Sequence, residues 1–147
     1  MRKALAAVVV LALAAGCGGS KKTPEMTKAQ YAAALSKLCS SANRQVAALG
    51  LTTDIKTWKQ NGQRAAEIAA QTVKGFEALT PPATLEDASE KYEKAAEELA
   101  AAVQDGADAA KNGDVKKFDD AISRQQNSGA IARGAATEIG AKACSGG

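Results

Sequence analysis

The chain has 147 residues, of which 46% are apolar, 3% are aromatic and none is histidine. Without imidazole it has no Ser-His or Cys-His nucleophile pair, no histidine-ligated haem and no zinc site that uses histidine. The formal net charge is +3, too small for the clustered positive charge of proteins that bind nucleic acid, so we expect no nucleic-acid partner.

Residues 1–16 have the form of a bacterial lipoprotein signal. Arg2 and Lys3 precede about a dozen apolar residues, which is the length of a secretory signal and too short for a membrane span. Small residues then lead directly to Cys17, whose thiol would accept a diacylglyceryl group and become the mature N-terminus. We expect lipid modification of Cys17. The alternative is an ordinary secretory signal cleaved near Ala15, which would leave Cys17 as a thiol.

Removal of this signal would leave a nearly neutral chain of one domain. The 19 basic residues become 17 without Arg2 and Lys3, against 16 acidic ones, which gives about +1. Residues 17–26 contain Gly, Ser, Lys and Pro without apolar periodicity, as expected of a flexible tether between the lipid and the folded part. Residues 27–147 suit a single helical domain.

Beyond the tether, apolar residues recur at helical spacing, which predicts four helices. The first begins at Thr27, which forms a capping box with Gln30, and ends at Gly50. The second begins near Asp54 and ends at residues 80–82, a Thr-Pro-Pro sequence whose prolines cannot continue a helix.

The third helix is expected from Thr84 to Asn112, and Asp114 caps a fourth. Because connections of a few residues make long neighbouring helices antiparallel, the predicted fold is all-α, an antiparallel up-down-up-down four-helix bundle. Its apolar stripes are rich in Ala and Gly, so the core is thin. The stripes hold Tyr31, Leu35, Leu38, Ala42, Val46 and Leu49; Ile55, Trp58, Gly62, Ala65, Ala69, Val73, Phe76 and Leu79; Leu85, Ala88, Tyr92, Ala96, Leu99, Val103 and Ala107; and Val115, Phe118, Ile122, Gln125, Gly129, Ala132, Ala136 and Ile139.

Cys39 and Cys144 are the cysteines left once Cys17 is assigned to lipid. In an oxidising compartment we expect a disulfide between them; two buried free thiols are the alternative. At 1.5 Å per residue, Cys39 lies about 15 Å from the Leu49 end of its helix, whereas a straight fourth helix would place Cys144 about 43 Å from that end. Such a gap is far beyond the reach of a disulfide.

The fourth helix must therefore stop or bend before its last residues. We expect it to stop at Gly140, after which residues 141–144 run back, extended, onto the first helix and recover about 13 Å. A kink at 128–129, a Ser-Gly pair, is the alternative.

These features together resemble a family. In order, they are the signal with its lipobox, Tyr31…Leu38-Cys39…Ala42-Asn43, Leu79-Thr80-Pro81-Pro82, Asn112-Gly113-Asp114…Phe118 and Cys144-Ser145-Gly146. The chain is similar over almost its whole length to small Ala-rich lipoproteins and secreted helical proteins found in many actinobacteria. The resemblance implies an extracytoplasmic helical domain whose N-terminal helix is joined to the C-terminus, and it implies no activity.

The third helix carries a group of carboxylates that would offer oxygen ligands to a divalent cation. A solvated charged face, with Glu90 and Lys94 spaced as an i,i+4 pair, is the stronger interpretation, and we expect no metal and no cofactor. The carboxylates are Glu86, Asp87, Glu90, Glu93, Glu97 and Glu98.

Four aromatic residues would line a small-molecule pocket between the helices, although packing in the core explains them more simply. Gln125 and Arg133 would supply polar contacts there, and a buried Gln125 needs a hydrogen-bond partner. The aromatic residues are Tyr31, Trp58, Phe76 and Tyr92.

The sequence favours a non-enzymatic lipoprotein of the cell envelope, anchored to the membrane through Cys17, whose helical domain binds an envelope protein or another envelope component. No catalytic residue is expected, because only carboxylates remain for acid–base chemistry. The alternative function is a small-molecule-binding or ligand-sensing bundle. An exposed apolar patch would favour the first function and a closed apolar cavity of several hundred Å³ the second.

Overall fold

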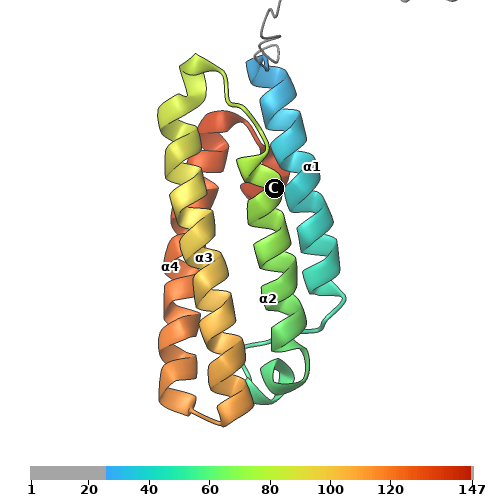
Figure 1. Cartoon of the computed structure of the whole chain (residues 1–147), viewed down its shortest axis with the longest axis vertical. Helices are drawn as coiled ribbons and strands as arrows, with labels where there is room; N and C mark the ends of the chain where they lie inside the picture. Colours follow the sequence, from blue (N-terminus) through green and yellow to red (C-terminus); the bar gives the residue numbers. More distant parts are fainter. Residues whose placement is uncertain (1–25, 147) are drawn as a thin grey trace, which may run out of the picture.

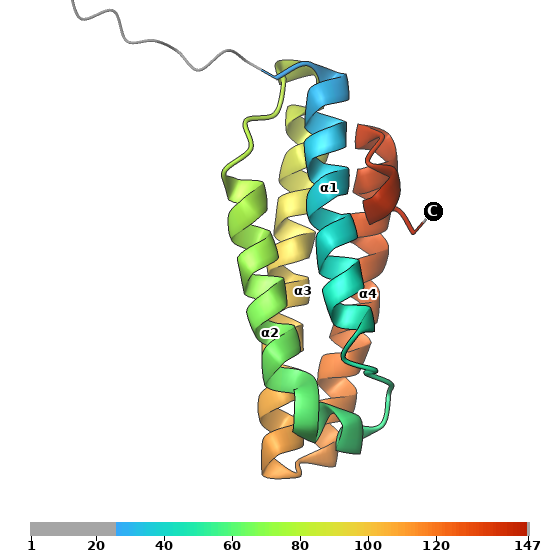
Figure 2. The ribbon, with the colours of Figure 1, turned by 90° about the vertical axis from the view of Figure 1, so that its right-hand side faces the viewer.

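The computed structural model of the chain describes residues 26–146. Figures 1 and 2 show four helices that run alternately down and up, as the sequence predicts, with no strand in the described part. The predicted lipid site Cys17, the signal and most of the tether lie outside these residues. The elements are α1 (Lys28–Ala47), α2 (Ile55–Glu77), the 3₁₀ helix η1 (Ala83–Leu85), α3 (Glu86–Asn112), α4 (Val115–Ile139) and the 3₁₀ helix η2 (Lys142–Cys144).

The helix starts lie close to the predicted positions because the predicted caps form. At α1, the Gln30 backbone N–H donates to Thr27 Oγ1 over 3.2 Å, and the Thr27 N–H donates to Gln30 Oε1 over 2.9 Å. Asp54 and Asp114 each accept a backbone N–H from the first turn of α2 and α4. Thr84, the predicted start of the third helix, instead lies in η1, which leads into α3.

Large side chains are concentrated in two clusters of the core. The upper cluster, near the N-terminal end of α1, contains Leu35 and Ile139, which are both 0% exposed. The lower cluster contains Trp58 and Phe118, whose rings meet edge to face with centroids 5.7 Å apart. Of the buried apolar residues that belong to neither cluster, Ile68 is large and the others are alanine.

Small residues let the helices approach closely between these clusters. Of the 23 buried apolar residues in the described part, 13 are alanine. A Cβ placed on Gly62 of α2 would lie 3.1 Å from the Cα of Ala107 on α3, so the two backbones are near contact there. The predicted thin core is confirmed.

The lower half of α1 is less buried than its stripe predicts. Val46 is 37% exposed, and Val115 at the start of α4 is 57% exposed, so both were wrongly assigned to the core. The reason is the length of α1, which has 20 residues against 27 in α3, a difference of about 10 Å. Figure 2 shows that α1 ends well above the lower end of α4. Near that end, Trp58 of α2 packs edge to face on Phe118 of α4.

The C-terminal tail returns to α1, as predicted, and is tied there by the Cys39–Cys144 disulfide, whose Cα atoms are 5.2 Å apart. α4 is one helix to Ile139 and the chain reverses at Gly140 (φ 89°), so the alternative kink is wrong. The tail forms the turn η2, so the expected extended conformation of residues 141–144 is also wrong. The distance to be recovered is smaller than expected because α1 ends well above the level at which α4 begins (Figure 2).

None of the helices in residues 26–146 combines the length and the apolar character that a membrane-spanning helix needs.

Candidate functional site

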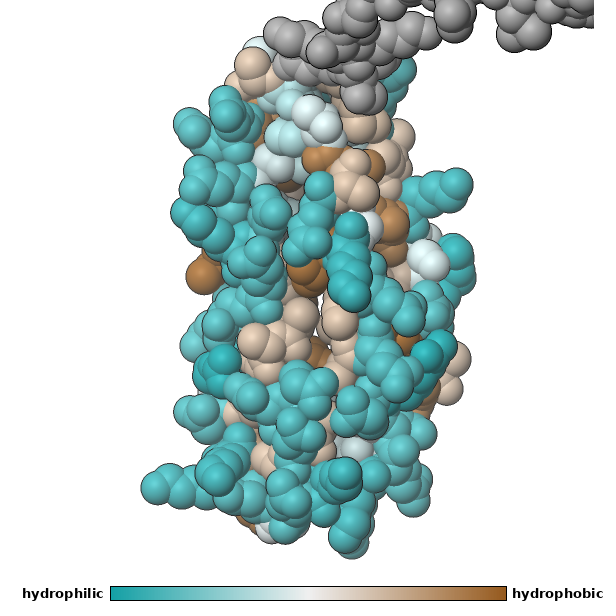
Figure 3. Space-filling view, viewed as in Figure 1, coloured by the Kyte–Doolittle hydropathy of each residue, from teal (hydrophilic) through white to brown (hydrophobic). Residues whose placement is uncertain are grey.

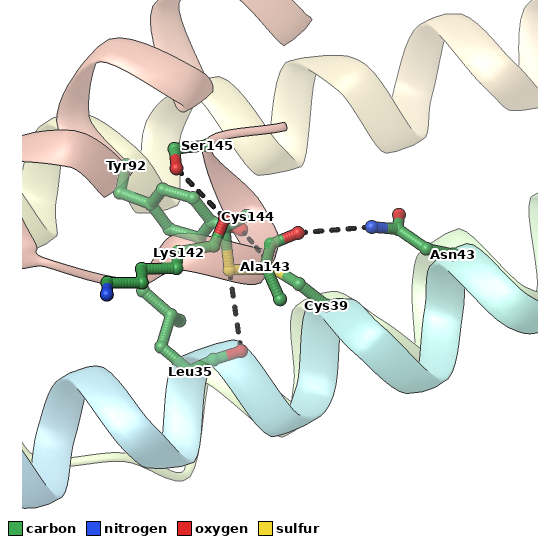
Figure 4. Close-up of a disulfide and its surroundings, with 8 residues drawn as sticks. All are labelled: Leu35, Cys39, Asn43, Tyr92, Lys142, Ala143, Cys144 and Ser145. Atoms are coloured by element: carbon green, nitrogen blue, oxygen red, sulfur yellow. Dashed lines mark hydrogen bonds between the residues drawn. A yellow bond between two sulfur atoms is a disulfide. The ribbon is translucent and has the colours of Figure 1, made fainter. Parts of the chain in front are cut away.

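The disulfide fixes α1, α3 and η2 to one another near the upper end of the bundle (Figure 4). The Asn43 side-chain amide donates to the Ala143 carbonyl oxygen over 3.1 Å, which joins η2 to α1 a second time. From α3, the Tyr92 hydroxyl lies 3.2 Å from Cys39 Sγ. The hydroxyl is the donor, because a sulfur in a disulfide carries no proton. Tyr92 is therefore held in place by the covalent bond between α1 and the tail.

A hollow of about 240 Å³ opens beside Tyr92, between the upper parts of α1, α2 and α3. Each of these helices contributes one aromatic ring, and the connection between α2 and α3 contributes Leu79 and Pro81. Four glutamates complete the lining, so we refer to it as the glutamate-rimmed pocket. Its residues are Tyr31, Phe76, Glu77, Leu79, Pro81, Glu86, Ser89, Glu90, Tyr92 and Glu93.

The aromatic rings of the pocket are held rigidly. The Phe76 and Tyr92 rings meet edge to face, with centroids 5.1 Å apart. The hydroxyls of Tyr31 and Ser89 share a hydrogen bond between α1 and α3. Burial raises the pKa of Tyr92 far above its usual value, so this phenol is neutral at physiological pH. The rings thus form a neutral, preorganised wall.

The rim of the pocket is negatively charged. Glu90 is paired with Lys94, and the hydrogen bond from the ammonium lowers the pKa of the Glu90 carboxyl. This pair is the one predicted from the i,i+4 spacing. The other three glutamates, Glu77, Glu86 and Glu93, make no ion pair or side-chain hydrogen bond within residues 26–146, and the pocket lining contains no basic residue. The pocket therefore favours a positively charged group.

The structure brings together three of the four aromatic residues predicted to line a pocket. Trp58 is at the other end of the bundle, where its indole N–H donates to the Thr52 carbonyl oxygen over 2.8 Å. Gln125 is half-buried, and its amide donates to the Ala102 carbonyl oxygen over 3.2 Å. Arg133 is exposed on α4. Neither Gln125 nor Arg133 lines the pocket.

The six carboxylates of α3 do not gather into one site. Glu86, Glu90 and Glu93 lie around the pocket, whereas Glu98 accepts two hydrogen bonds from the Arg124 guanidinium on α4. In residues 26–146 no three Asp, Glu, Cys or His side chains are placed to hold a metal ion together. The group behaves as the solvated charged face that the sequence favours, with part of it turned toward the pocket.

A larger hollow, of about 330 Å³, lies at the opposite end, beside the connection between α3 and α4. It has no aromatic lining, and its charges are partly paired: Arg124 binds Asp105 over 2.6 Å, and Lys117 lies 3.4 Å from Asp114. Despite its size, this hollow offers a ligand few unpaired groups, so the glutamate-rimmed pocket is the better candidate.

Exposed large apolar side chains are few and scattered. In the described part they are Val46 on α1 and Val115 and Ile131 on α4. Figure 3 shows a face that is mostly hydrophilic, with apolar residues in small groups. The structure thus provides no extended apolar surface on that face.

Sequence reasoning missed several residues of the pocket. Glu77 and Pro81 lie at or beyond the end of α2, and no periodic pattern relates them to Tyr31. Ser89 could have been found from the sequence, since it is three residues before Tyr92 and therefore on the same face of α3.

Comparison with protein-family models, curated proteins and solved structures finds no match to the chain. The resemblance to actinobacterial lipoproteins therefore stays a prediction.

Proposed function

We propose that the chain is a lipid-anchored extracytoplasmic protein of the type its N-terminal sequence resembles, and that its helical domain binds an envelope component without catalysis. The signal-like residues 1–16 and Cys17 support the anchor. The Cys39–Cys144 disulfide fits an oxidising setting.

The observation that carries the binding function is the glutamate-rimmed pocket. Interaction surfaces on soluble domains are commonly marked by contiguous apolar patches, and the exposed apolar residues here are scattered. The pocket instead combines aromatic rings from three helices with three carboxylates that have no ion-pair partner within residues 26–146. Small-molecule sites use such a mixture of an apolar wall and a few polar groups. Although the pocket is open rather than the closed apolar cavity expected of a sensor, it supports a small-molecule ligand better than a protein partner.

Two measurements test this proposal. The intact mass of the protein from its own host, before and after reduction, should correspond to a chain that begins at Cys17 with added acyl groups and gains two hydrogens on reduction. A chain that begins elsewhere and carries no lipid would overturn the anchor.

For the binding function, the full chain is screened by NMR against small aromatic molecules of positive, zero and negative charge. Binding is scored by the shifts of pocket residues such as Tyr31 and Tyr92. An envelope pull-down against a surface-scrambled variant runs in parallel. If no molecule shifts the pocket signals and no partner is enriched, the binding function is wrong.

A further inference from the structure

Resting on this binding function, we propose that the glutamate-rimmed pocket is selective for small organic cations, with an ammonium group among the glutamates and an apolar body against the aromatic rings. The charges of the lining favour a cation. Among the described residues, four carboxylates and no basic side chain line the pocket, and the Lys94 ammonium neutralises one of the carboxylates. An anion entering this site meets repulsion from every charged group of the lining.

The arrangement of the carboxylates suits an organic cation better than a metal ion. A divalent metal needs several oxygen ligands at 2.0–2.6 Å from one point, and the described residues contain no such group of acidic side chains. An ammonium group on a carbon body makes lower demands, because it interacts with separate carboxylates through three donors and over longer distances. Glu77 comes from α2, whereas Glu86 and Glu93 come from α3.

The aromatic wall favours a cation that also has an apolar part. A cation near the face of a tyrosine or phenylalanine ring is attracted by the ring quadrupole, and Tyr31, Phe76 and Tyr92 all line the hollow. Leu79 and Pro81 add apolar surface at the connection between α2 and α3. These contacts favour a ligand with an alkyl or aromatic body, which a hydrated inorganic cation lacks.

The volume limits the size of the ligand. The hollow has a volume of about 240 Å³. This is below the usual range for drug-sized ligands, so the pocket suits a molecule of about ten non-hydrogen atoms. At the affinity per atom typical of small ligands, we expect a dissociation constant of about 1 mM.

The test uses three probes with the same aromatic body: phenethylammonium, its neutral analogue 2-phenylethanol and the anion phenylacetate. The full chain, as its host processes it, is titrated with each probe in non-ionic detergent, with empty micelles as the blank, and binding is followed by calorimetry and by the NMR shifts of pocket residues. We expect phenethylammonium to bind at least about tenfold more tightly than the alcohol, phenylacetate not to bind, and added salt to weaken the binding of the amine.

Matched variants show whether the rim is responsible. Glu86→Gln with Glu93→Gln removes two carboxylates of the pocket, and we expect about a tenfold loss of amine binding. Asp87→Asn with Glu97→Gln removes the same charge from the same helix away from the pocket and should leave binding within about twofold. None of the four side chains makes an ion pair in the described part of the chain. Each variant removes one of the two acidic residues in the first turn of α3, so any effect on folding should be small and similar in both.

The outcomes separate this inference from the binding function on which it rests. If the alcohol binds as tightly as the amine, or if both double variants lose the same affinity, the pocket remains a binding site and its selectivity for cations is refuted. If no probe of any charge shifts the pocket signals, the inference fails, and the binding function fails with it if the envelope pull-down also enriches no partner.

Discussion

Removal of the Cys39–Cys144 disulfide should be among the most damaging changes to the stability of the bundle. The bond closes a segment with a sequence separation of 105. In the chain-entropy model, a loop of that length removes about 4.8 kcal/mol of unfolded-state entropy at 25 °C, and measured values for disulfides are commonly 2–4 kcal/mol. The double change Cys39→Ala with Cys144→Ala should therefore cost at least about 2 kcal/mol.

The rest of the structure offers little to replace the bond. Three residues of α1 are buried, Tyr31, Leu35 and Cys39. Apart from the disulfide, a hydrogen bond from the Asn43 side chain to the Ala143 carbonyl oxygen joins α1 to the tail. In the double variant we therefore expect α1 and η2 to detach before the α2–α3–α4 unit unfolds. Amide hydrogen exchange would detect this as faster exchange confined to α1 and the tail.

Urea unfolding followed by circular dichroism measures the global effect. With a slope of about 2 kcal/mol per molar urea for a domain of this size, the midpoint should fall by about 1–2 M in the double variant. A reductant should lower the midpoint of the unmodified protein to the same value and leave the variant unchanged. A midpoint within about 0.3 M of the unmodified protein, or an equal effect of reductant on both proteins, would refute the reasoning.

Three further predictions follow from packing and burial. Leu35→Ala should cost about 2–5 kcal/mol because the side chain is 0% exposed, whereas Val46→Ala on the same helix should stay within about 0.5 kcal/mol; equal costs in urea unfolding would contradict the described packing of α1. Gly134→Ala, with open space around the new Cβ, should raise Tm, while Gly62→Ala places a Cβ 3.1 Å from the backbone of α3 and should lower it; shifts in the same direction would be inconsistent with this close approach. Burial raises the pKa of Tyr92, so its contribution to stability is fully present below the unfolded pKa of about 10 and is lost as pH rises above it; Tyr92→Phe should reduce this alkaline loss in unfolding measured from pH 8 to 11.

The helices could be predicted because their signals are local. Thr27, Asp54 and Asp114 cap the first turns through side-chain oxygens within three residues of the backbone they bind. Gly113 and Gly140 end α3 and α4 with positive φ angles that other residues rarely adopt. The return of the tail could also be predicted, because the reach of a disulfide excludes a straight fourth helix.

The exposure of Val46 could not be predicted, because it depends on where α1 ends relative to its neighbours rather than on its own periodicity. Because α1 ends above the lower end of α4 (Figure 2), the distance that the tail must recover to bring Cys144 to Cys39 is also shorter. The tail therefore closes the disulfide as a compact turn. The pocket depends on tertiary placement in the same way. Periodicity places Tyr31, Phe76 and Tyr92 on buried stripes, but the level at which three helices align decides that these rings share one wall while Trp58 does not.

The composition of the helices also explains why the candidate site is at an end of the bundle. Close approach of alanine and glycine leaves little space between the helices: a Cβ on Gly106 would lie 3.1 Å from the Gln125 amide nitrogen, and one on Gly62 would lie 3.1 Å from Ala107 of α3. Both hollows described above lie at ends, where connections leave the helices and longer side chains replace alanine. A thin core thus excludes a large closed cavity along these contacts and confines a ligand to a small, open, charged pocket. At such a site, selectivity must come from the charge at the rim more than from the area that the ligand buries, which is why the comparison of amine and alcohol tests it directly.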